Sequence, residues 1–364
     1  MKNLDYLYAN PPNLSKFIDR KKSIKNSKTL IIGAQNSGKS YILLNSLLEE
    51  KKGEFLYINL DDIRLDTDEI FTNLASFLQT NKDIKAIAID GLKVAHKNYF
   101  KLLESLNLSK ILLSTRSNTL NLNGFSKLVL HNLDFEEFIA FDRKGGEPGA
   151  ILGSFLTQGN GLKNSFLQSY ELAIFHQEML LYSYEKTEIL ALIEAVKFIN
   201  STFSAFGIYK SLKEKIKISK DKIYSTFSKF EDENLIYFVD KFEPNSTLKK
   251  LYFADFSLQD SLSYKKDFHK KLANALFCEL LTTNHKIYYT DELDFYIPSK
   301  NTAFLLIPFS SSDLIFLKFK KLFLRLKELK VTKLVVISMG NSASLSIEGI
   351  RCEIVPFWQF ALSI

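Results

Sequence analysis

The sequence predicts an α/β protein that begins with a parallel sheet, continues with a helical segment and ends in a second mixed α/β segment. Three observations predict this class. Short apolar stretches alternate with helical stretches between residues 28 and 127, which is the pattern of βαβ units and of a parallel sheet. A glycine-containing loop joins the first apolar stretch to a helix. Beyond a glycine-rich break at residues 145–149, the pattern is helical to about residue 235 and mixed after it.

Five apolar stretches are the expected strands of the first sheet. Each is short and is followed by polar residues or glycine, as expected where a parallel sheet carries its functional loops at the carboxyl ends of its strands. They lie at residues 29–32, 55–59, 86–89, 111–114 and 128–130.

The loop after the first strand has the sequence GAQNSGKS at residues 33–40, which matches the Walker A pattern for phosphate binding. Its glycines let successive backbone N–H groups turn inward around phosphate oxygens, where a Cβ would clash. We expect Lys39 to reach the β- and γ-phosphates and Ser40 to bind Mg²⁺. The helix expected over residues 41–48 directs its positive end at the same anion. The sequence therefore predicts a site for ATP and Mg²⁺ whose nucleotide-binding residues are Gly33, Asn36, Ser37, Gly38, Lys39, Ser40 and Tyr41.

A second acidic element supports this site. The apolar stretch over residues 84–90 ends in Asp90, as a Walker B strand does, and Asp90 would hold Mg²⁺ directly or through water. ATPases of this type usually carry Glu next, which polarises the attacking water, whereas this chain has Gly91. Two interpretations of Asp61 and Asp62, at the end of the preceding strand, stay open: they replace the missing acid, or they form a solvated strand end.

Arg116 is the third candidate for catalysis, with Lys39 and Asp90. It follows the strand expected at residues 111–114, at a place where a polar side chain commonly contacts the γ-phosphate. An arginine there would pair with phosphate or with a neighbouring subunit. The alternative is an arginine that only closes a strand.

Composition excludes several classes of function. Neither cysteine (Cys278, Cys352) and none of the five histidines has a neighbour at metal-ligand spacing, so a metal site made by protein ligands alone is not expected. The apolar stretches are much shorter than a membrane span, and we expect a soluble protein of the cytoplasm. The net charge of +7 permits nucleic-acid binding without establishing it.

Residues 188–250 predict a winged helix. Helices are expected over residues 188–199, 208–215 and from 220 onward, with Ser219 as N-cap of the third, and strands over 235–239 and 248–253. Two interpretations of the lysines around the third helix stay open: phosphate contacts with DNA, or a solvated face interspersed with Glu214, Asp221 and Glu231. These lysines are Lys213, Lys215, Lys217, Lys220, Lys222 and Lys229.

Together, these segments resemble the AAA-type ATPases of bacteria and archaea that carry a C-terminal domain of uncharacterised function. The resemblance rests on the Walker A loop and on further motifs in the same order along the chain: YINLDDIR at 57–64, LDFEEF at 133–138, KLYFAD at 250–255, ELDF at 292–295 and VPFW at 355–358. Gly91 departs from the family pattern, and its Gly-Gly-x-Pro turn is matched only loosely at residues 159–162.

The resemblance implies a P-loop NTPase domain of AAA type, a winged-helix domain and a C-terminal domain of restriction-endonuclease-like fold. We place a lead-in at residues 1–25 and the three domains at 26–186, 187–250 and 251–364. The resemblance also implies homo-oligomers or protein partners, with a nucleotide site shared between subunits.

An active nuclease of this last fold needs an acid on a helix, an acid on a strand and an acid-x-Lys pair on the next strand. Glu279 and Asp294 match the first two positions, but residues 304–309 supply neither acid nor lysine, and Lys300 lies before them. We expect an inactive domain.

The lead interpretation is an ATP-binding protein that hydrolyses ATP with Mg²⁺ to rearrange its domains. The alternatives are a nucleotide-gated binding module without appreciable turnover, favoured by Gly91, and a DNA-binding repair or processing factor.

Overall fold

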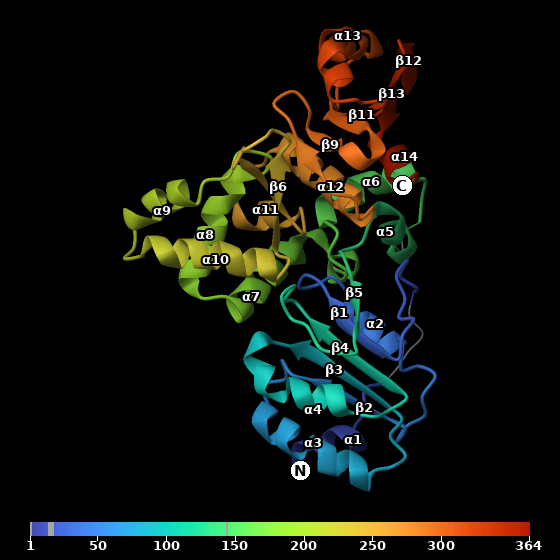
Figure 1. Cartoon of the computed structure of the whole chain (residues 1–364), viewed down its shortest axis with the longest axis vertical. Helices are drawn as coiled ribbons and strands as arrows, with labels where there is room; N and C mark the ends of the chain where they lie inside the picture. Colours follow the sequence, from blue (N-terminus) through green and yellow to red (C-terminus); the bar gives the residue numbers. More distant parts are fainter. Residues whose placement is uncertain (1, 14–17, 143–144) are drawn as a thin grey trace. The chain divides into compact units, whose positions relative to one another are not determined.

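The computed structural model describes residues 2–13, 18–142 and 145–364, and the chain divides into two compact units (Figure 1). Unit 1 consists of Met1–Asn132 and the short segment Asp232–Leu235, and unit 2 consists of Leu133–Glu231 and Ile236–Ile364. Part of the expected lead-in, residues 1 and 14–17, lies outside the described residues.

Unit 1 is built on a parallel sheet of five strands, which confirms the α/β class and the strands expected from the sequence. The strand order is β2-β3-β4-β1-β5, so the glycine-containing loop leaves a strand that has a neighbour on each side. The strands are β1 (Lys28–Ile32), β2 (Phe55–Asn59), β3 (Ala86–Leu92), β4 (Lys110–Thr115) and β5 (Ser126–Val129).

Successive side chains of these strands point to opposite faces of the sheet and form two cores. On one face, Leu30 and Ile32 of β1 pack in a cluster that includes Leu74 and Leu103 of the helices on that side. On the other face, Ile31 of β1 packs with the helix that follows the loop. The helices of unit 1 are α1 (Lys2–Ala9), α2 (Lys39–Asn45), α3 (Thr67–Thr80) and α4 (Phe100–Ser105).

The first half of unit 2 is largely helical, as the sequence predicts after residue 145. Its helices are α5 (Phe135–Phe141), α6 (Pro148–Gln158), α7 (Ser169–Ser183), α8 (Lys186–Ala195), α9 (Ala205–Lys213) and α10 (Lys220–Asp232), whose last residue belongs to unit 1. Antiparallel strands β6 (Ile236–Lys241) and β7 (Lys249–Phe253) follow, and then the short helix α11 (Leu258–Leu262). Ser219 accepts a hydrogen bond from Lys222 N at 3.1 Å, as expected of the N-cap of α10.

Strands β6 and β7 also form one end of an eight-stranded sheet with the order β12-β13-β11-β10-β9-β8-β6-β7. Its remaining strands are β8 (Tyr288–Tyr289), β9 (Phe295–Ile297), β10 (Thr302–Leu306), β11 (Lys333–Ser338), β12 (Ala343–Ile347) and β13 (Ile350–Pro356). The accompanying helices are α12 (Phe268–Thr282), α13 (Ser312–Glu328) and α14 (Phe357–Ala361). The domain limits expected at 186/187 and 250/251 therefore fall inside α8 and β7, and the domain ranges stay predictions.

Buried polar residues explain two of the family-like motifs in unit 2. Asp255, the acid of the KLYFAD motif, accepts hydrogen bonds from Asn164 Nδ2 at 2.7 Å and from Ser257 N at 2.9 Å. Gly159 has a φ of +82°, and a Cβ built on it would overlap Ser257 Oγ. The glycine turn and the acid therefore belong to one packed network.

The two acids considered for a nuclease bind backbone amides instead. Glu279 is fully buried and accepts a hydrogen bond from Phe135 N, at the start of α5, at 2.9 Å. Asp294 accepts from Leu306 N of β10 at 2.8 Å. These contacts give both carboxylates a structural role in unit 2.

Within the described ranges, no helix combines the length and the apolar character that crossing a membrane requires.

Candidate nucleotide-binding site

The loop between β1 and α2 carries two residues in the left-handed region of backbone space. Asn36 has a φ of 65° and Gly38, the N-cap of α2, has a φ of 92°. Gly33 begins the loop, and its N–H donates to Thr115 O at the end of β4, at 3.2 Å. A Cβ on Gly33 would overlap Leu130 O, so no other residue fits there without a backbone shift. The sequence thus places a tight turn at the carboxyl end of β1, a strand between β4 and β5.

Lys39 is the first residue of α2 and is 9% exposed. Its Nζ donates to Gly33 O at 3.0 Å and to Ala34 O at 2.6 Å, so the ammonium lies inside the curve of the loop. Burial of the ammonium lowers the pKa of Lys39 to about 8; the charge of Asp90 opposes this shift and that of Arg116 adds to it. A buried cation that only carbonyl dipoles contact is suited to receive an anion.

The environment differs among the three polar side chains of Ser37, Ser40 and Tyr41. Ser37 is fully buried, and within the described residues its Oγ has no hydrogen-bond partner. Ser40 is exposed in the first turn of α2. Tyr41 OH accepts a hydrogen bond from Ile18 N, and burial raises the pKa of this phenol. The structure places the exposed Ser40 hydroxyl and the buried cation of Lys39 in the first turn of α2, and the binding of phosphate and magnesium there stays a prediction.

Arg20 stabilises the loop of residues 33–40 through hydrogen bonds to backbone carbonyls, a role that the sequence did not reveal. It is 8% exposed; its Nη1 donates to Ser37 O at 2.7 Å and its Nη2 to His131 O at 3.0 Å. The sequence shows Arg20 only as part of a basic cluster with two lysines. Its burial depends on contacts with residues far along the chain, which no local pattern encodes.

Asp90 lies at the carboxyl end of β3 and is 6% exposed. Its Oδ1 accepts from Ser114 Oγ, and its Oδ2 accepts from Tyr57 OH at 3.0 Å. Burial, followed by the charge and hydrogen bond of Asp90, raises the pKa of Tyr57 far above its ordinary value. Tyr57 therefore stays protonated and orients the carboxylate as a hydrogen-bond donor.

The backbone at Gly91 differs from that of a regular strand, so a glutamate could not take this position without a change in the strand. Its φ is +84°, and the pairing of β3 with β4 shifts register between Ile89 and Leu92. A Cβ built on Gly91 would lie 3.1 Å from Asp61 Oδ2. The carboxylate of Asp61 thus occupies the space toward which a side chain at position 91 would point, and Lys93 Nζ contacts it at 2.7 Å.

Asp62 differs from its neighbour. Its carboxylate pairs with Arg64 Nη2 at 2.6 Å, and hydrogen bonds from Arg64 hold the pKa of Asp62 at about 2. The two acids that the sequence could not distinguish are therefore separated by the structure. Both acids form an ion pair, Asp61 with Lys93 and Asp62 with Arg64, and the carboxylate beside Gly91 is that of Asp61.

Arg116 follows β4 and connects the loop with a distant segment. Its Nη1 donates to Gln35 Oε1 at 3.1 Å and lies 3.7 Å from Glu233 Oε2. The charges of Arg116, Asp90, Asp61 and Glu233 all act on the ammonium of Lys39. The structure therefore brings together the three residues predicted for catalysis and adds Glu233, which sequence analysis missed.

Glu233 lies beside Arg116 because hydrogen bonds hold the segment Asp232–Leu235 against the residues that follow β4. Asp232 accepts from Ser117 Oγ at 2.6 Å and from Thr119 N at 2.9 Å. Asn234, with a φ of 56°, donates through Nδ2 to Arg116 O at 2.9 Å. No motif marks this segment, and its contacts lie more than a hundred residues away in sequence.

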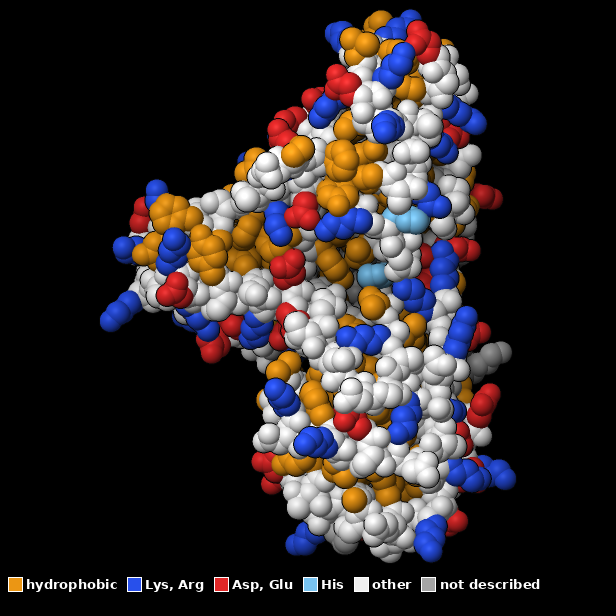
Figure 2. Space-filling model, in the orientation of Figure 1, with side chains coloured by type: hydrophobic (Ala, Val, Ile, Leu, Met, Phe, Trp, Pro, Cys, Tyr) orange, Lys and Arg blue, Asp and Glu red, His pale blue; other side chains and the backbone are white. Residues whose placement is uncertain are grey.

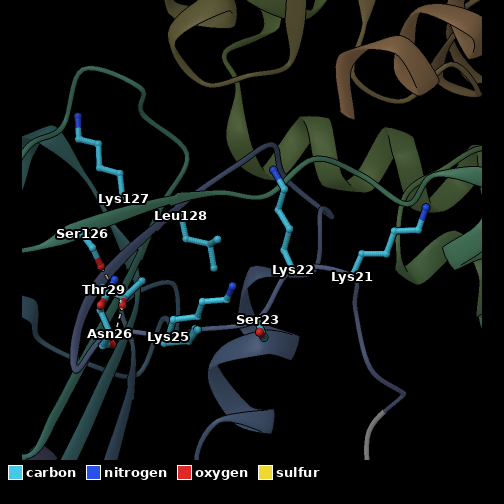
Figure 3. Close-up of a pocket in the computed structure, with 10 residues that line it drawn as sticks. Lys21, Lys22, Ser23, Lys25, Asn26, Thr29, Ser126, Lys127 and Leu128 are labelled. Carbon is cyan, nitrogen blue, oxygen red and sulfur yellow. Dashed lines mark hydrogen bonds between the residues drawn. The ribbon is translucent and has the colours of Figure 1, made fainter. Parts of the chain in front are cut away.

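A separate basic pocket of about 330 Å³ lies beside β1 and β5 of unit 1 (Figure 3). Among the described residues, four lysines and no acidic side chain line it, and Thr29 Oγ1, also in its lining, lies 3.3 Å from Ser126 Oγ. Lys22 Nζ donates to Val129 O at 2.8 Å. The lysines are Lys21, Lys22, Lys25 and Lys127, so the basic cluster of the sequence divides: Arg20 supports the loop and its two neighbours line this pocket.

Comparison with known proteins gives distant similarities. No family model matches the chain. It is 25% identical over 398 residues to an uncharacterised protein of Methanocaldococcus jannaschii, an alignment that covers 94% of this chain and 90% of that protein.

Solved structures with a similar course of the chain include the Walker-type ATPase of Pyrococcus abyssi, with a TM-score of 0.42 and 13% identity over 64% of this chain and 90% of that one. The ORC1 protein of Aeropyrum pernix, solved in complex with DNA, has a TM-score of 0.34 and 12% identity, covering 66% and 87%. Values this low assign neither a family nor a ligand to this chain, so its function is inferred from the geometry of the loop.

Proposed function

We propose that this protein binds ATP with Mg²⁺ at the loop of residues 33–40 and hydrolyses the nucleotide to rearrange its domains. The observation that carries the proposal is the buried ammonium of Lys39, held between Gly33 O and Ala34 O inside a loop with two left-handed residues. Such a cation, at the start of a helix and within a glycine-containing loop, is the chemistry that phosphate oxygens require.

In this proposal, different residues of the site bind the phosphates and the metal ion. Backbone amides of the loop and Lys39 bind phosphate oxygens, while the Ser40 hydroxyl and Asp90 hold the metal. Mg²⁺, when bound, neutralises charge that develops on the phosphates. Tyr57 and Ser114 fix the two oxygens of Asp90, which keeps that carboxylate in one orientation.

Asp61 is the residue proposed to orient and deprotonate the attacking water. Its carboxylate lies where a side chain of residue 91 would point, and its charge acts on Lys39. In this proposal, Asp61 performs the role of the glutamate that ATPases of this type carry at the position of Gly91. Arg116 is proposed to pair with phosphate, because its guanidinium already lies beside Gln35 of the loop.

Binding tests the first step. We expect Lys39→Ala to weaken the affinity for ATP by about tenfold or more, because one charge-assisted contact with phosphate is worth about 1.5–3 kcal/mol. Titration of the full chain with a fluorescent ATP analogue measures this. The matched control is Lys127→Ala, an exposed lysine of β5 outside the loop, which should leave the affinity unchanged. Equal affinities of wild type and Lys39→Ala would exclude the loop as the site.

A nucleotide-gated module without turnover is the second candidate function. The glycine at position 91 favours it, because no side chain of that residue can polarise water. Both candidates share the binding site and differ in the role of Asp61. Nucleotide bound through Lys39 without hydrolysis would support the module.

We also propose that residues 187–250 form a winged-helix domain and residues 251–364 an inactive domain of restriction-endonuclease-like fold. The order of α8, α9, α10, β6 and β7 supports the first, and the mixed sheet with α12 and α13 supports the second. A cytoplasmic location and assembly into homo-oligomers stay part of this proposal.

A further inference from the structure

Six of the lysines around α9 and α10 fall into two groups that the sequence does not separate. Lys215 pairs with Glu194 at 3.1 Å, Lys222 with Glu185 at 2.9 Å and Lys229 with Glu188 at 3.0 Å. Glu188 and Glu194 are buried, so two of these three pairs tie α8 to the segment that contains α9 and α10. The charges of these three lysines are therefore neutralised by acidic side chains within unit 2.

The second group consists of Lys210, Lys213 and Lys220, which lie over aromatic rings that are exposed or half-buried. Lys229 of the first group also lies over a ring, but that ring, of Tyr184, is buried. Lys210 Nζ is 4.8 Å from the ring centroid of Phe206, and Lys213 Nζ is 5.6 Å from that of Tyr209. Lys220 Nζ lies 5.4 Å from Phe206 and 5.5 Å from Tyr224. Across the described ranges, none of these lysines forms an ion pair with an acidic side chain.

Two of the three rings beneath these lysines are exposed, and the third, of Tyr209, is half-buried. Phe206 is 43% exposed and Tyr224 is 47% exposed, and the rings of Phe206 and Tyr209 are stacked with centroids 6.0 Å apart. Figure 2 shows hydrophobic and basic side chains side by side at the tip on the left, which α9 and the start of α10 form in Figure 1. We call Phe206, Tyr209, Tyr224 and the three lysines the aromatic–lysine cluster.

We propose that the aromatic–lysine cluster binds single-stranded nucleic acid. Exposed rings stack on the flat face of an unpaired base, and lysines around them neutralise the adjacent phosphates. An ammonium that lies over a ring in the free protein moves to a phosphate when a base takes its place on that ring. The cluster therefore offers both contacts that a single strand needs within one surface of unit 2.

The same features disfavour duplex DNA as the preferred ligand. A duplex hides the faces of its bases, so only the lysines of the cluster would contribute, through phosphate contacts that depend strongly on salt. The lysines most central to α10, Lys222 and Lys229, are held by Glu185 and Glu188 and are not available as a continuous basic face. Stacking on exposed rings is what distinguishes the single strand.

This inference does not depend on the proposed nucleotide site, because the cluster lies in unit 2 and the loop of residues 33–40 lies in unit 1. Loss of ATP binding in Lys39→Ala would leave the cluster intact. Conversely, loss of strand binding through the cluster would leave ATP binding unchanged.

The test is fluorescence anisotropy of the full chain with labelled oligothymidine, oligouridine and a duplex, at low and at moderate salt. We expect Phe206→Ala and Tyr224→Ala each to weaken single-strand binding by about tenfold, from the loss of one stacked base. Phe206→Trp should restore the affinity, because it restores a stacking surface. The two oligonucleotides decide between DNA and RNA as the natural strand.

The matched control is Lys229→Gln, which removes a lysine of α10 that is paired with Glu188, and it should leave single-strand binding unchanged. Lys213→Gln should lower the salt dependence of binding by about one released counterion. The proposal is overturned if no oligonucleotide binds at low salt, or if Phe206→Ala and Lys229→Gln have equal effects. It is also overturned if the duplex, or vesicles of anionic lipid, bind more tightly than the single strands.

Discussion

At the scale of single residues, the site is defined by a lysine that burial makes easier to deprotonate. Lys39 has a pKa lowered to about 8, so its charge changes in a range where most lysines stay protonated. Phosphate binds the charged form, and each equilibrium then shifts the other.

This lysine predicts that the affinity for ATP falls as the pH rises above about 8. Between about pH 7 and pH 9.5 the free protein loses the Lys39 proton, and the loss of affinity should approach about tenfold per pH unit above the pKa. The dissociation constant of a fluorescent ATP analogue, measured across this range, provides the readout. Lys39→Ala is the control, since its weaker binding should show no such decline.

The sign of the effect on folding is opposite. The folded pKa lies below the ordinary value of about 10.5, so the unfolded chain binds more protons between the two values. The buried charge therefore lowers stability below about pH 8, and the free energy of unfolding rises as the pH passes from about 8 toward 10.5. Affinity and stability thus change in opposite directions with pH.

Asp61 gives the second prediction at this scale. If its carboxylate takes the place of the acid that Gly91 lacks, Asp61→Asn should lower kcat for ATP by about a hundredfold or more, with little change in the affinity for ATP. Steady-state hydrolysis and nucleotide titration measure the two quantities. Asp62→Asn is the matched control, because Asp62 is adjacent but pairs with Arg64. Equal loss of kcat in both variants would contradict the role of Asp61.

At the scale of elements, the short segment Asp232–Leu235 is the least expected part of unit 1. It joins the end of α10 to β6 and lies against the residues that follow β4. Through Glu233 it also reaches Arg116. The residues proposed to contact nucleotide are thereby connected with the start of the hairpin formed by β6 and β7.

Removal of the anchor should be costly. Asp232→Ala removes the acceptor of the Ser117 hydroxyl and the Thr119 amide. Ser117 Oγ keeps Thr119 Oγ1 as a partner at 2.9 Å and Thr119 is exposed, so we expect a loss of about 1–2 kcal/mol in the stability of unit 1. Amide hydrogen exchange at β4 and the following residues reports on this unit separately. Asp221→Ala, at the other end of α10, should cost no more than about 1 kcal/mol. Unchanged protection in Asp232→Ala would show that the segment is not needed to hold unit 1 together.

Sequence patterns predicted the elements better than their connections. The five parallel strands and the glycine-containing loop follow from local apolar runs and glycine spacing, and the structure places each strand within three residues of its expected limits. The contacts of Arg20, Asp61 and Glu233 depend on residues brought close only by folding. For the same reason, the sequence could not show that β6 and β7 belong to the eight-stranded sheet.

At the scale of the whole molecule, the chain passes between the two units three times, after residues 132, 231 and 235. Two of these passages flank the segment that contains Glu233. A change in the pairing of Arg116 on nucleotide binding would thus act next to the connections between the units. The aromatic–lysine cluster lies in unit 2.

The most direct test of the central claim is Mg²⁺-dependent ATP hydrolysis by the purified full chain, with wild type measured beside Lys39→Ala. Turnover in the wild type that Lys39→Ala abolishes is the predicted result, since the site depends on that ammonium. Hydrolysis at the wild-type rate in Lys39→Ala would contradict the account, because the activity would then arise outside the loop of residues 33–40.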